Sequence, residues 1–293
     1  MRLVYLGLPL GALWLARHGH VPRVICLGHP EAPGRGRVLR RLASRGSLVL
    51  GRPDLHDPDV FRVLEEARPD AILSFFWPRK IPPEVLALAP RGAFGTHPSL
   101  LPRWRGPDPY FWAIDAGDAE TGVTLHRLEA EYDTGAILAQ RRIALEPRWN
   151  AWKLARALDR PALSLLVECA DALARGEALE GRPQPLDGVT EAPRPDDEAM
   201  ALDWHASAEE VVRRVRACAP YPGASAELDG TYVEVVEAAV CDENGPRALE
   251  VAEAFETRDG RVAVRCGAGA VVLCRVRDAE GEEVDPLGLL GLE

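Results

Sequence analysis

Residues 92–140 read GAFGTHPSLLPRWRGPDPYFWAIDAGDAETGVTLHRLEAEYDTGAILAQ and carry the strongest signal in the chain. A short apolar segment ends at His97, a Ser-Leu-Leu-Pro turn follows it, and an Asp-Thr-Gly turn begins at Asp133. A histidine and a carboxylate at the edges of extended segments suit proton transfer at an acyl centre. The stretch therefore predicts a core strand that ends at a site, together with two side chains of that site.

Strand-like and helix-like segments alternate on the amino-terminal side of this stretch. The segments 2–6, 21–28 and 71–76 are apolar, whereas 10–17, 38–44, 58–67 and 81–88 have helical spacing. Asp57 and Pro58 are typical of a helix start, with the aspartate as its N-cap. Such alternation predicts a Rossmann-like, mostly parallel sheet with flanking helices. Ligands of these sheets sit at the carboxyl ends of the strands, where we expect His97.

The composition changes beyond a long helical stretch over 149–175, which we expect to be kinked or split at Pro161. The following residues, 181–197, are rich in proline and poor in apolar side chains. Further on, a helix capped by Ser207 and Glu210 precedes short alternating segments with frequent turn signals, which predict a small antiparallel β-barrel-like domain. We expect a catalytic domain over residues 1–180, a linker over 181–200 and a C-terminal β domain over 201–293.

The charge distribution is uneven. The net charge of the 293 residues is −10, and residues 201–293 hold 9 Arg, no Lys and 19 acidic residues, which accounts for all of it. An acidic surface repels phosphate backbones, so the C-terminal part is a poor candidate for nucleic-acid binding.

Several classes of protein are disfavoured because their sequence patterns are absent from the chain. No apolar run is long enough to cross a membrane, and the first residues read as a strand rather than a signal peptide. The six cysteines form no C-x-x-C pair and fit no zinc pattern, so we expect no metal. Gly7-Leu-Pro-Leu-Gly11 lacks the spacing of a dinucleotide-binding turn. We infer a cytoplasmic protein with no membrane partner.

Arginines gather between residues 35 and 45. Arg35, Arg37, Arg40, Arg41 and Arg45 all lie there. The cluster is either a solvated face or a contact for a phosphate group of a substrate, and the residues alone do not decide between the two.

Ordered motifs along nearly the whole chain resemble the folate-dependent formyltransferase family. Its members transfer a formyl group from N10-formyltetrahydrofolate to an amine, and they include methionyl-tRNA formyltransferases and amino-sugar nucleotide N-formyltransferases. Residues 202–224 resemble the start of the C-terminal domain in both branches. The motifs in the first half are Gly95-Thr96-His97, residues 99–102, Arg105-Gly106, residues 121–124 and Asp133-Thr134-Gly135.

The resemblance implies roles for individual residues. His97 and Asp133 would be two of three catalytic residues: His97 would stabilise or protonate the oxyanion formed when an amine attacks the formyl carbon, and Asp133 would hold the imidazole and accept a proton. The predicted folate contacts are the loop residues Ser99, Leu100, Leu101 and Pro102. Phe76 and Trp77 would line the pterin pocket. The predicted acceptor contacts are Arg105, Gly106, Arg35 and Arg37.

The chain departs from the family pattern at Gly95, where the family has an asparagine that helps to bind the oxyanion. Loss of such a donor typically costs about 10²–10³ in rate. Thr96 is a poor replacement, because alternate residues of a strand face opposite sides. A water above Gly95 or a substrate group would have to act as the donor, and otherwise activity is weak or absent.

Three hypotheses for the function remain open, and two of them differ in the acceptor. The acidic tail favours a small primary amine, such as an amino-sugar nucleotide, whose phosphates a few arginines would bind. The alternatives are methionyl-tRNA and a folate-binding homologue that has lost catalysis. The sequence leaves the acceptor, the effect of Gly95 and the oligomeric state undetermined.

Overall fold

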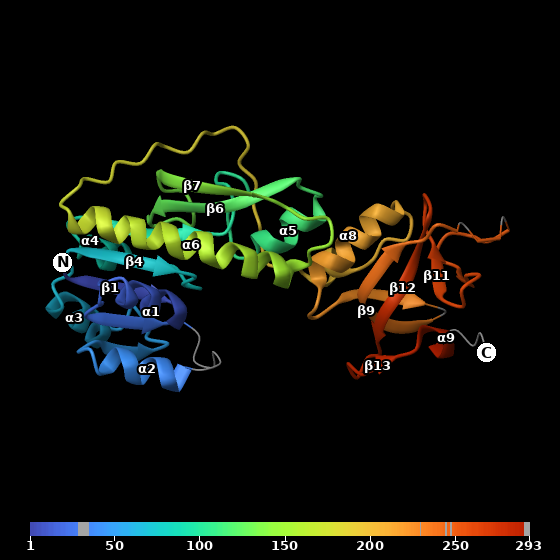
Figure 1. The fold of residues 1–293 in the computed structure, drawn as a ribbon, viewed down its shortest axis with the longest axis horizontal. Helices are drawn as coiled ribbons and strands as arrows, with labels where there is room; N and C mark the ends of the chain where they lie inside the picture. Colours follow the sequence, from blue (N-terminus) through green and yellow to red (C-terminus); the bar gives the residue numbers. More distant parts are fainter. Residues whose placement is uncertain (29–34, 229, 244, 247, 290–293) are drawn as a thin grey trace. The chain divides into compact units, whose positions relative to one another are not determined.

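The computed structural model describes residues 1–28, 35–228, 230–243, 245–246 and 248–289, without the side chains of residues 35, 37–39 and 289. The chain forms two compact units (Figure 1). The first comprises Met1–Pro107, Gly122–Ile143 and Ala157–Glu191. The second comprises Asp108–Thr121, Ala144–Arg156 and Ala192–Glu293.

A seven-stranded sheet runs in the order β3-β2-β1-β4-β5-β6-β7. Neighbouring strands from β3 to β5 pair in parallel, and β6 pairs antiparallel with β5. The sheet confirms the predicted Rossmann-like, mostly parallel class. Its strands are β1 (Leu3–Gly7), β2 (Val24–Leu27), β3 (Leu48–Gly51), β4 (Ala71–Phe75), β5 (Ala93–His97), β6 (Glu120–Arg127) and β7 (Ile137–Ala144).

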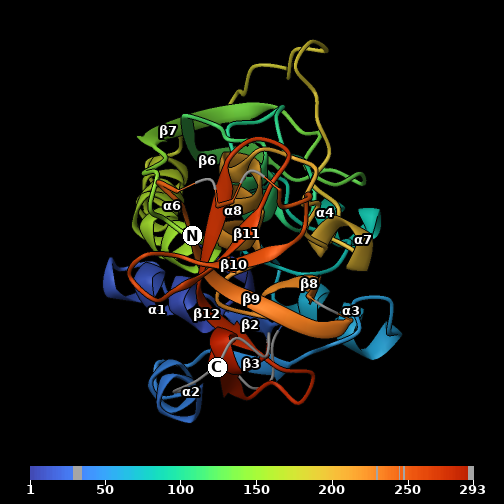
Figure 2. The ribbon, with the colours of Figure 1, turned by 90° about the vertical axis from the view of Figure 1, so that its right-hand side faces the viewer.

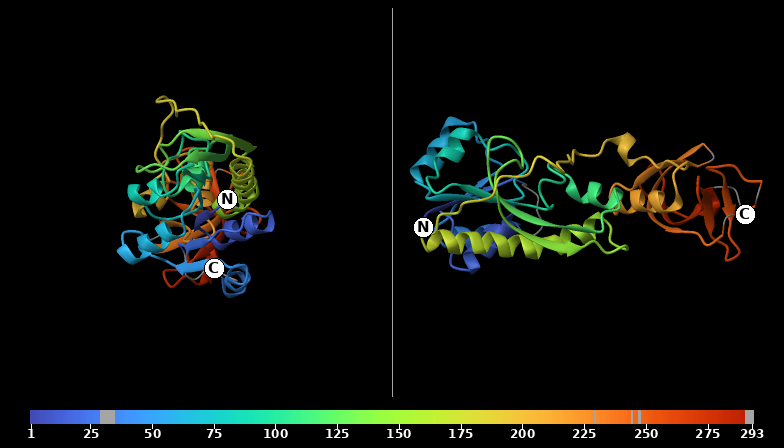
Figure 3. Two further views of the ribbon diagram at one scale, coloured as in Figure 1. Left: turned by 90° about the vertical axis from the view of Figure 1, so that its left-hand side faces the viewer. Right: turned by 90° about the horizontal axis from the view of Figure 1, so that it is seen from above.

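In the described part of the chain, five helices lie between these strands, and a sixth follows β7. They are α1 (Pro9–Arg17), α2 (Arg35–Ala43), α3 (Pro58–Glu66), α4 (Pro83–Ala87), α5 (Pro109–Asp115) and α6 (Ala151–Ala174). The predicted N-cap of α3 is confirmed, since the Asp57 carboxylate accepts the backbone N–H of Asp59 at 2.8 Å. Of the two outcomes expected at Pro161, a kink or a split, the split does not occur, because α6 continues through the proline as one helix (Figure 3). Leu158, Ala162 and Leu165 are fully buried around the proline, and this packing offsets the lost backbone hydrogen bond.

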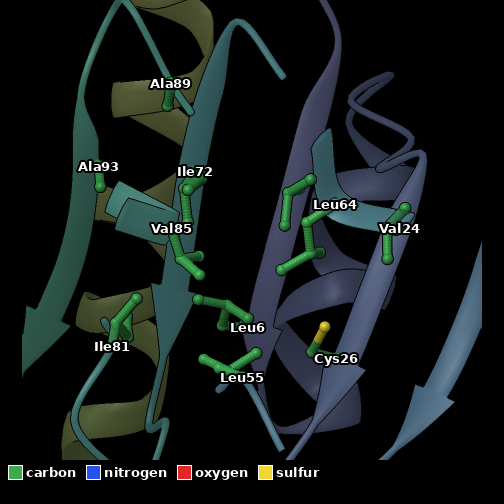
Figure 4. Packing of buried hydrophobic residues seen from close by; sticks show 11 residues of the cluster. Leu6, Val24, Cys26, Leu55, Leu64, Ile72, Ile81, Val85, Ala89 and Ala93 are labelled. Carbon is green, nitrogen blue, oxygen red and sulfur yellow. The ribbon is translucent and has the colours of Figure 1, made fainter. Parts of the chain in front are cut away.

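The core between the sheet and helices α3 and α4 holds the strands rigidly (Figure 4). Leu6 of β1 and Ile72 of β4 pack with Leu64 of α3 and Val85 of α4, and each is at most 1% exposed. Burying an aliphatic side chain of this size contributes roughly 1.5–3 kcal/mol. All five residues of β4 are buried, as its continuous apolar sequence predicts.

The carboxyl ends of β1 and β4 approach each other closely. Gly7 adopts a φ of +138°, and a Cβ at this position would overlap the carbonyl oxygen of Phe75, so only glycine fits there. Strand order reverses between these two strands, and β4 leads directly into Phe76 and Trp77. Open α/β sheets bind their ligands at this position.

The second unit contains a six-stranded antiparallel sheet in the order β10-β11-β12-β9-β8, with β13 paired to β12 (Figure 2). Register shifts between β9 and β12 around Leu273 and Arg275 bend it. The predicted capping box of α8 is present between Ser207 and Glu210. The elements are α7 (Asp197–Met200), α8 (Ala208–Cys218), β8 (Ala224–Leu228), β9 (Thr231–Val240), β10 (Ala254–Glu256), β11 (Val262–Arg265), β12 (Ala270–Arg277), β13 (Glu283–Val284) and α9 (Pro286–Leu289). This confirms the antiparallel, barrel-like class predicted for the C-terminal part.

Candidate active site

The structure brings His97 and Asp133 together in the first unit. His97 is the last residue of β5, and Asp133 lies in the turn between β6 and β7. Nδ1 of His97 is 3.4 Å from Oδ2 of Asp133, and their side chains are 7% and 16% exposed. The two residues singled out from the sequence therefore form a pair of a buried imidazole and a half-buried carboxylate at the end of a core strand.

One loop positions both members of this pair. Nε2 of His97 donates to the carbonyl oxygen of Trp104 at 2.7 Å, and Oδ2 of Asp133 accepts the backbone N–H of Gly106 at 2.9 Å. Asp133 itself has a φ of +55°, which is uncommon for a residue other than glycine. The carboxylate therefore reaches the pair from a constrained backbone conformation.

A second histidine, His126 of β6, faces the other oxygen of the carboxylate. Its Nε2 is 3.6 Å from Oδ1 of Asp133, and its side chain is 3% exposed. Nδ1 is 2.9 Å from the carbonyl oxygen of Arg127, so it carries the ring hydrogen. Burial, assisted by the nearby His97 and opposed by Asp133, lowers the pKa of His126 to about 4. The ring is neutral near pH 7, and its unprotonated Nε2 faces the carboxylate.

The sequence analysis missed His126, although a signal was present. His126 shares strand parity with Thr124 of the Thr-Gly-Val-Thr motif, so its side chain belongs on the same face of β6. In the structure it lies directly opposite Gly95 in the β5–β6 register.

The space beside Gly95 is occupied by protein atoms. A Cβ at this position would lie 2.8 Å from Cδ2 of Leu128 and 3.5 Å from Cβ of Ser74. A water or a substrate group at that position would meet the same atoms. The hydroxyl of neighbouring Thr96 is buried without a hydrogen-bond partner among the described residues.

The Ser-Leu-Leu-Pro loop is held by two side chains to which the sequence analysis assigned no role. The hydroxyl of Thr124 accepts the N–H of Leu101 at 3.1 Å and donates to the carbonyl oxygen of Ser99 at 2.7 Å. The Gln140 amide donates to the Leu101 carbonyl and to the Thr124 hydroxyl, both at 2.9 Å. Ser99 and Leu101 are buried, whereas Leu100 and Pro102 are half-buried.

Phe76 and Trp77 follow β4 beside the end of β5. Phe75 pairs with Thr96 in register, so Phe76 and His97 come at the same level of neighbouring strands. The guanidinium of Arg79 lies 4.6 Å from the centre of the Trp77 ring. Nε1 of Trp77 is buried and has no hydrogen-bond partner among the described residues.

The four residues expected at the acceptor have different surroundings. The Arg105 guanidinium donates from Nε and Nη2 to Oε1 of Gln184, at 3.1 and 2.7 Å. Gly106 donates its N–H to Asp133. Arg35 and Arg37 lie in the first turn of α2, and their side chains fall outside the described residues. The structure thus leaves the substrate contacts of these four residues as predictions.

The described residues contain no cluster of three or more His, Cys, Asp or Glu side chains suited to a metal ion. Within those same ranges, no helix is both long and apolar enough to cross a membrane. The half-buried carboxylate of Asp133, flanked by two buried imidazoles, is suited to accepting and passing on a proton.

Comparison with known families covers both units. The Formyl transferase model matches residues 31–169, and the model of the formyl transferase C-terminal domain matches residues 196–290. A methionyl-tRNA formyltransferase of Burkholderia vietnamiensis is 34% identical over 302 residues, covering 97% of this chain and 92% of that protein. Its counterpart in Burkholderia multivorans is 33% identical with the same coverage.

Solved structures share the fold. HypX from Aquifex aeolicus, in complex with tetrahydrofolic acid, has a TM-score of 0.67 and 25% identity over 99% of this chain. This chain spans about half of HypX, 47% of its length. WlaRD, a sugar 3N-formyl transferase in the presence of dTDP and 5-N-formyl-THF, has a TM-score of 0.70 at 14% identity, covering 93% of this chain and 96% of that one. The family models and the full-length relatives agree with the motifs around His97, and the chain belongs to the formyltransferase family of enzymes.

Proposed function

We propose that this enzyme transfers a formyl group from N10-formyltetrahydrofolate to a primary amine, with His97 and Asp133 as its catalytic residues. The observation that carries the proposal is the pair itself, with Nδ1 of His97 and Oδ2 of Asp133 separated by 3.4 Å at the carboxyl end of β5. Structures of HypX with tetrahydrofolic acid and of WlaRD with 5-N-formyl-THF support a folate as the donor.

The residues at the end of β4 fit a flat heteroaromatic ring with hydrogen-bond acceptors. Phe76 and Trp77 supply apolar surface, and the buried Nε1 of Trp77 is a donor that lacks a partner among the described residues. Leu100 and Pro102 extend this surface from the neighbouring loop. When bound, the folate would supply an activated formyl carbon.

The side chains would manage the proton of the attacking amine. The Nε2–H of His97 is committed to Trp104, whereas the 3.4 Å distance from Nδ1 to Asp133 exceeds the usual hydrogen-bond range. Nδ1 is therefore the ring atom that would turn towards the reacting atoms. The amine would attack the formyl carbon, and the bond from that carbon to N10 of the folate would break. Asp133 would take the proton from the amine and share it with this nitrogen, and the proton would then pass to N10 of the leaving tetrahydrofolate. Such positioned acids and bases typically contribute about 10²–10⁴ in rate.

The charge distribution favours a small amine, such as an amino-sugar nucleotide, as the acceptor. All of the net charge of −10 resides in residues 201–293. A tRNA acceptor requires many phosphate contacts, which an acidic surface opposes, whereas a small phosphorylated amine needs only a few arginines.

Methionyl-tRNA is the second candidate. The specific observation in its favour is the 34% identity with a methionyl-tRNA formyltransferase across 97% of this chain.

The reaction is tested by incubating the purified full chain with N10-formyltetrahydrofolate and a panel of primary amines while tetrahydrofolate release is followed. We expect His97→Ala and Asp133→Asn each to lower kcat by at least about 10²-fold. His205→Ala is the matched control, since this imidazole is 81% exposed in the second unit. Equal turnover by all four proteins would refute the proposed catalytic pair.

The acceptor is tested by competition and salt. A tRNA acceptor predicts binding that weakens steeply between 50 and 200 mM salt, by a factor of roughly 10³ or more for six phosphate contacts. We expect instead weak, non-saturating tRNA binding and turnover with a small amine. Folate binding without turnover of any acceptor would favour the inactive homologue and contradict the proposal.

A further inference from the structure

Residues 181–191, here called the strap, follow α6. They lie against the loop that follows β5 and against the turn between β6 and β7 that holds Asp133. Arg182 exchanges two backbone hydrogen bonds with Ile137 at the start of β7, at 2.8 and 2.9 Å. The strap is drawn in yellow in Figure 1. Near its end, the carbonyl oxygen of Thr190 accepts the N–H of Arg105 at 2.9 Å. A segment without helix or strand is thus fixed at both ends to the catalytic unit.

Gln184 faces inwards from an exposed part of the strap. It is half-buried, while residues 182, 183 and 185–188 are exposed. Its Nε2 donates to the carbonyl oxygens of Asp133 and Gly135 at 2.6 and 2.8 Å, and its Oε1 accepts the guanidinium of Arg105. The orientation of the amide is determined, because carbonyl oxygens only accept and a guanidinium only donates.

Thr190 contacts the loop that follows β5. Its hydroxyl accepts the backbone N–H of Trp104 at 2.8 Å, and the carbonyl oxygen of that same residue accepts Nε2–H of His97. One side chain of the strap therefore holds the residue whose carbonyl orients His97, and another binds the backbone carbonyl of Asp133.

We propose that Gln184 and Thr190 are positioning residues that hold Asp133 and His97 in register for formyl transfer. Asp133 has a φ of +55°, and the Gln184 amide bonds to its carbonyl oxygen and to that of Gly135, on either side of Thr134. Without these bonds the turn can relax to a commoner backbone conformation, which displaces the carboxylate. A displacement of about 1 Å at a catalytic group can cost 10²-fold in rate.

Two substitutions at Gln184 separate the contact with the turn from the contact with Arg105. Gln184→Met keeps the length and removes every hydrogen bond of the amide. Gln184→Glu keeps an acceptor for Arg105 but places an oxygen opposite the carbonyls of Asp133 and Gly135. We expect both variants to lose about 10–100-fold in kcat with the KM for the folate donor within about threefold of the parent.

Thr190 provides an independent pair. Thr190→Val has nearly the same shape and lacks the acceptor for the Trp104 N–H, whereas Thr190→Ser retains it. We expect kcat to fall about tenfold or more in the valine variant and to recover in the serine variant. Thermal unfolding of each variant is measured alongside. If one variant does not fold, the pair of substitutions at the other residue still tests the proposal.

The proposal rests on the proposed function, so one measurement does not require turnover. In the full chain labelled with ¹⁵N-histidine, we expect the His97 imidazole signals to shift in Gln184→Met and Thr190→Val and to stay in place in Thr190→Ser. Shifted signals in a protein without formyl transfer would support the strap and refute the function.

Three results would overturn the positioning role. The first is parental kcat in Gln184→Met or Thr190→Val. The second is a parental kcat in Gln184→Glu together with a lowered kcat in Gln184→Met. That result would mean that Gln184 acts only through its contact with Arg105. The third is a set of His97 signals unchanged in every variant.

Discussion

Nε2 of His126 lies 3.6 Å from Oδ1 of Asp133, whose Oδ2 is 3.4 Å from Nδ1 of His97. Each imidazole places its other nitrogen on a backbone carbonyl, at Arg127 and Trp104 respectively. The two nitrogens that face the carboxylate therefore lack hydrogens while both rings are neutral. The two ring nitrogens and the two carboxylate oxygens thus place four basic atoms around one small volume, an arrangement suited to holding a shared proton.

The buried His126 makes stability dependent on pH. Its pKa is lowered from the ordinary value of 6.5 to about 4 in the folded protein, so the unfolded chain binds more protons between these values. Stability therefore rises with pH across this window, and it is lost as the pH falls from about 6.5 towards 4. We expect His126→Gln to reduce the loss of unfolding free energy between pH 7 and pH 5 by about 2 kcal/mol, measured by urea denaturation. Identical pH dependence in parent and variant would contradict the neutral state of His126.

We expect the hydroxyl of Thr124 to keep the Ser-Leu-Leu-Pro loop in one conformation. Thr124→Val leaves the N–H of Leu101 and the carbonyl oxygen of Ser99 without their partner, and both lie in a buried setting. We expect a loss of about 1–3 kcal/mol in unfolding free energy and a raised KM for the folate donor. Thr124→Ser retains the hydroxyl and serves as the control. A valine variant as stable as the serine variant would contradict this role.

The features that follow from local sequence could be predicted. The strand ending at His97, the N-cap Asp57 and the capping box from Ser207 to Glu210 all depend on residues close together in the chain. The pairing of His97 with Asp133 was also anticipated, because both residues stand at the edges of predicted extended segments.

The features that depend on tertiary register could not be predicted in the same way. His126 faces Asp133 only because β6 pairs with β5 so that it lies opposite Gly95. Gln184 lies in a proline-rich segment whose composition suggests a linker, and its role emerges only when the strap lies against the turn of Asp133. Pro161 is tolerated in α6 because tertiary packing outweighs the local preference.

Trp77 provides a test of the donor pocket. Trp77→Phe removes the buried Nε1, which has no hydrogen-bond partner among the described residues, so no protein group loses a partner. We expect the unfolding free energy to fall by about 1–2 kcal/mol through the smaller ring packed against the core, with no added cost from an unpaired partner. If the folate accepts a hydrogen bond from this nitrogen, its KM rises about tenfold, equivalent to about 1.4 kcal/mol. An unchanged KM would show that the indole nitrogen does not contact the donor.

Gly95 and Leu128 are expected to be energetically coupled. A side chain at residue 95 would press against Cδ2 of Leu128, which would lie 2.8 Å from its Cβ. We expect Gly95→Asn to lower the unfolding free energy by about 1–3 kcal/mol through overpacking, and Leu128→Ala to relieve this. The double variant should therefore be more stable than the sum of the single changes, by at least about 0.5 kcal/mol in a urea-denaturation cycle.

The same cycle tests whether the position can hold an oxyanion donor. With Leu128 truncated, the amide introduced by Gly95→Asn gains room beside His126 on the face shared with His97. We expect kcat to rise above that of Leu128→Ala alone, because a positioned amide donor contributes up to about 10²–10³ in rate. Additive stabilities together with an unchanged kcat would show that Leu128 does not control this space and that the donor of the reaction lies elsewhere.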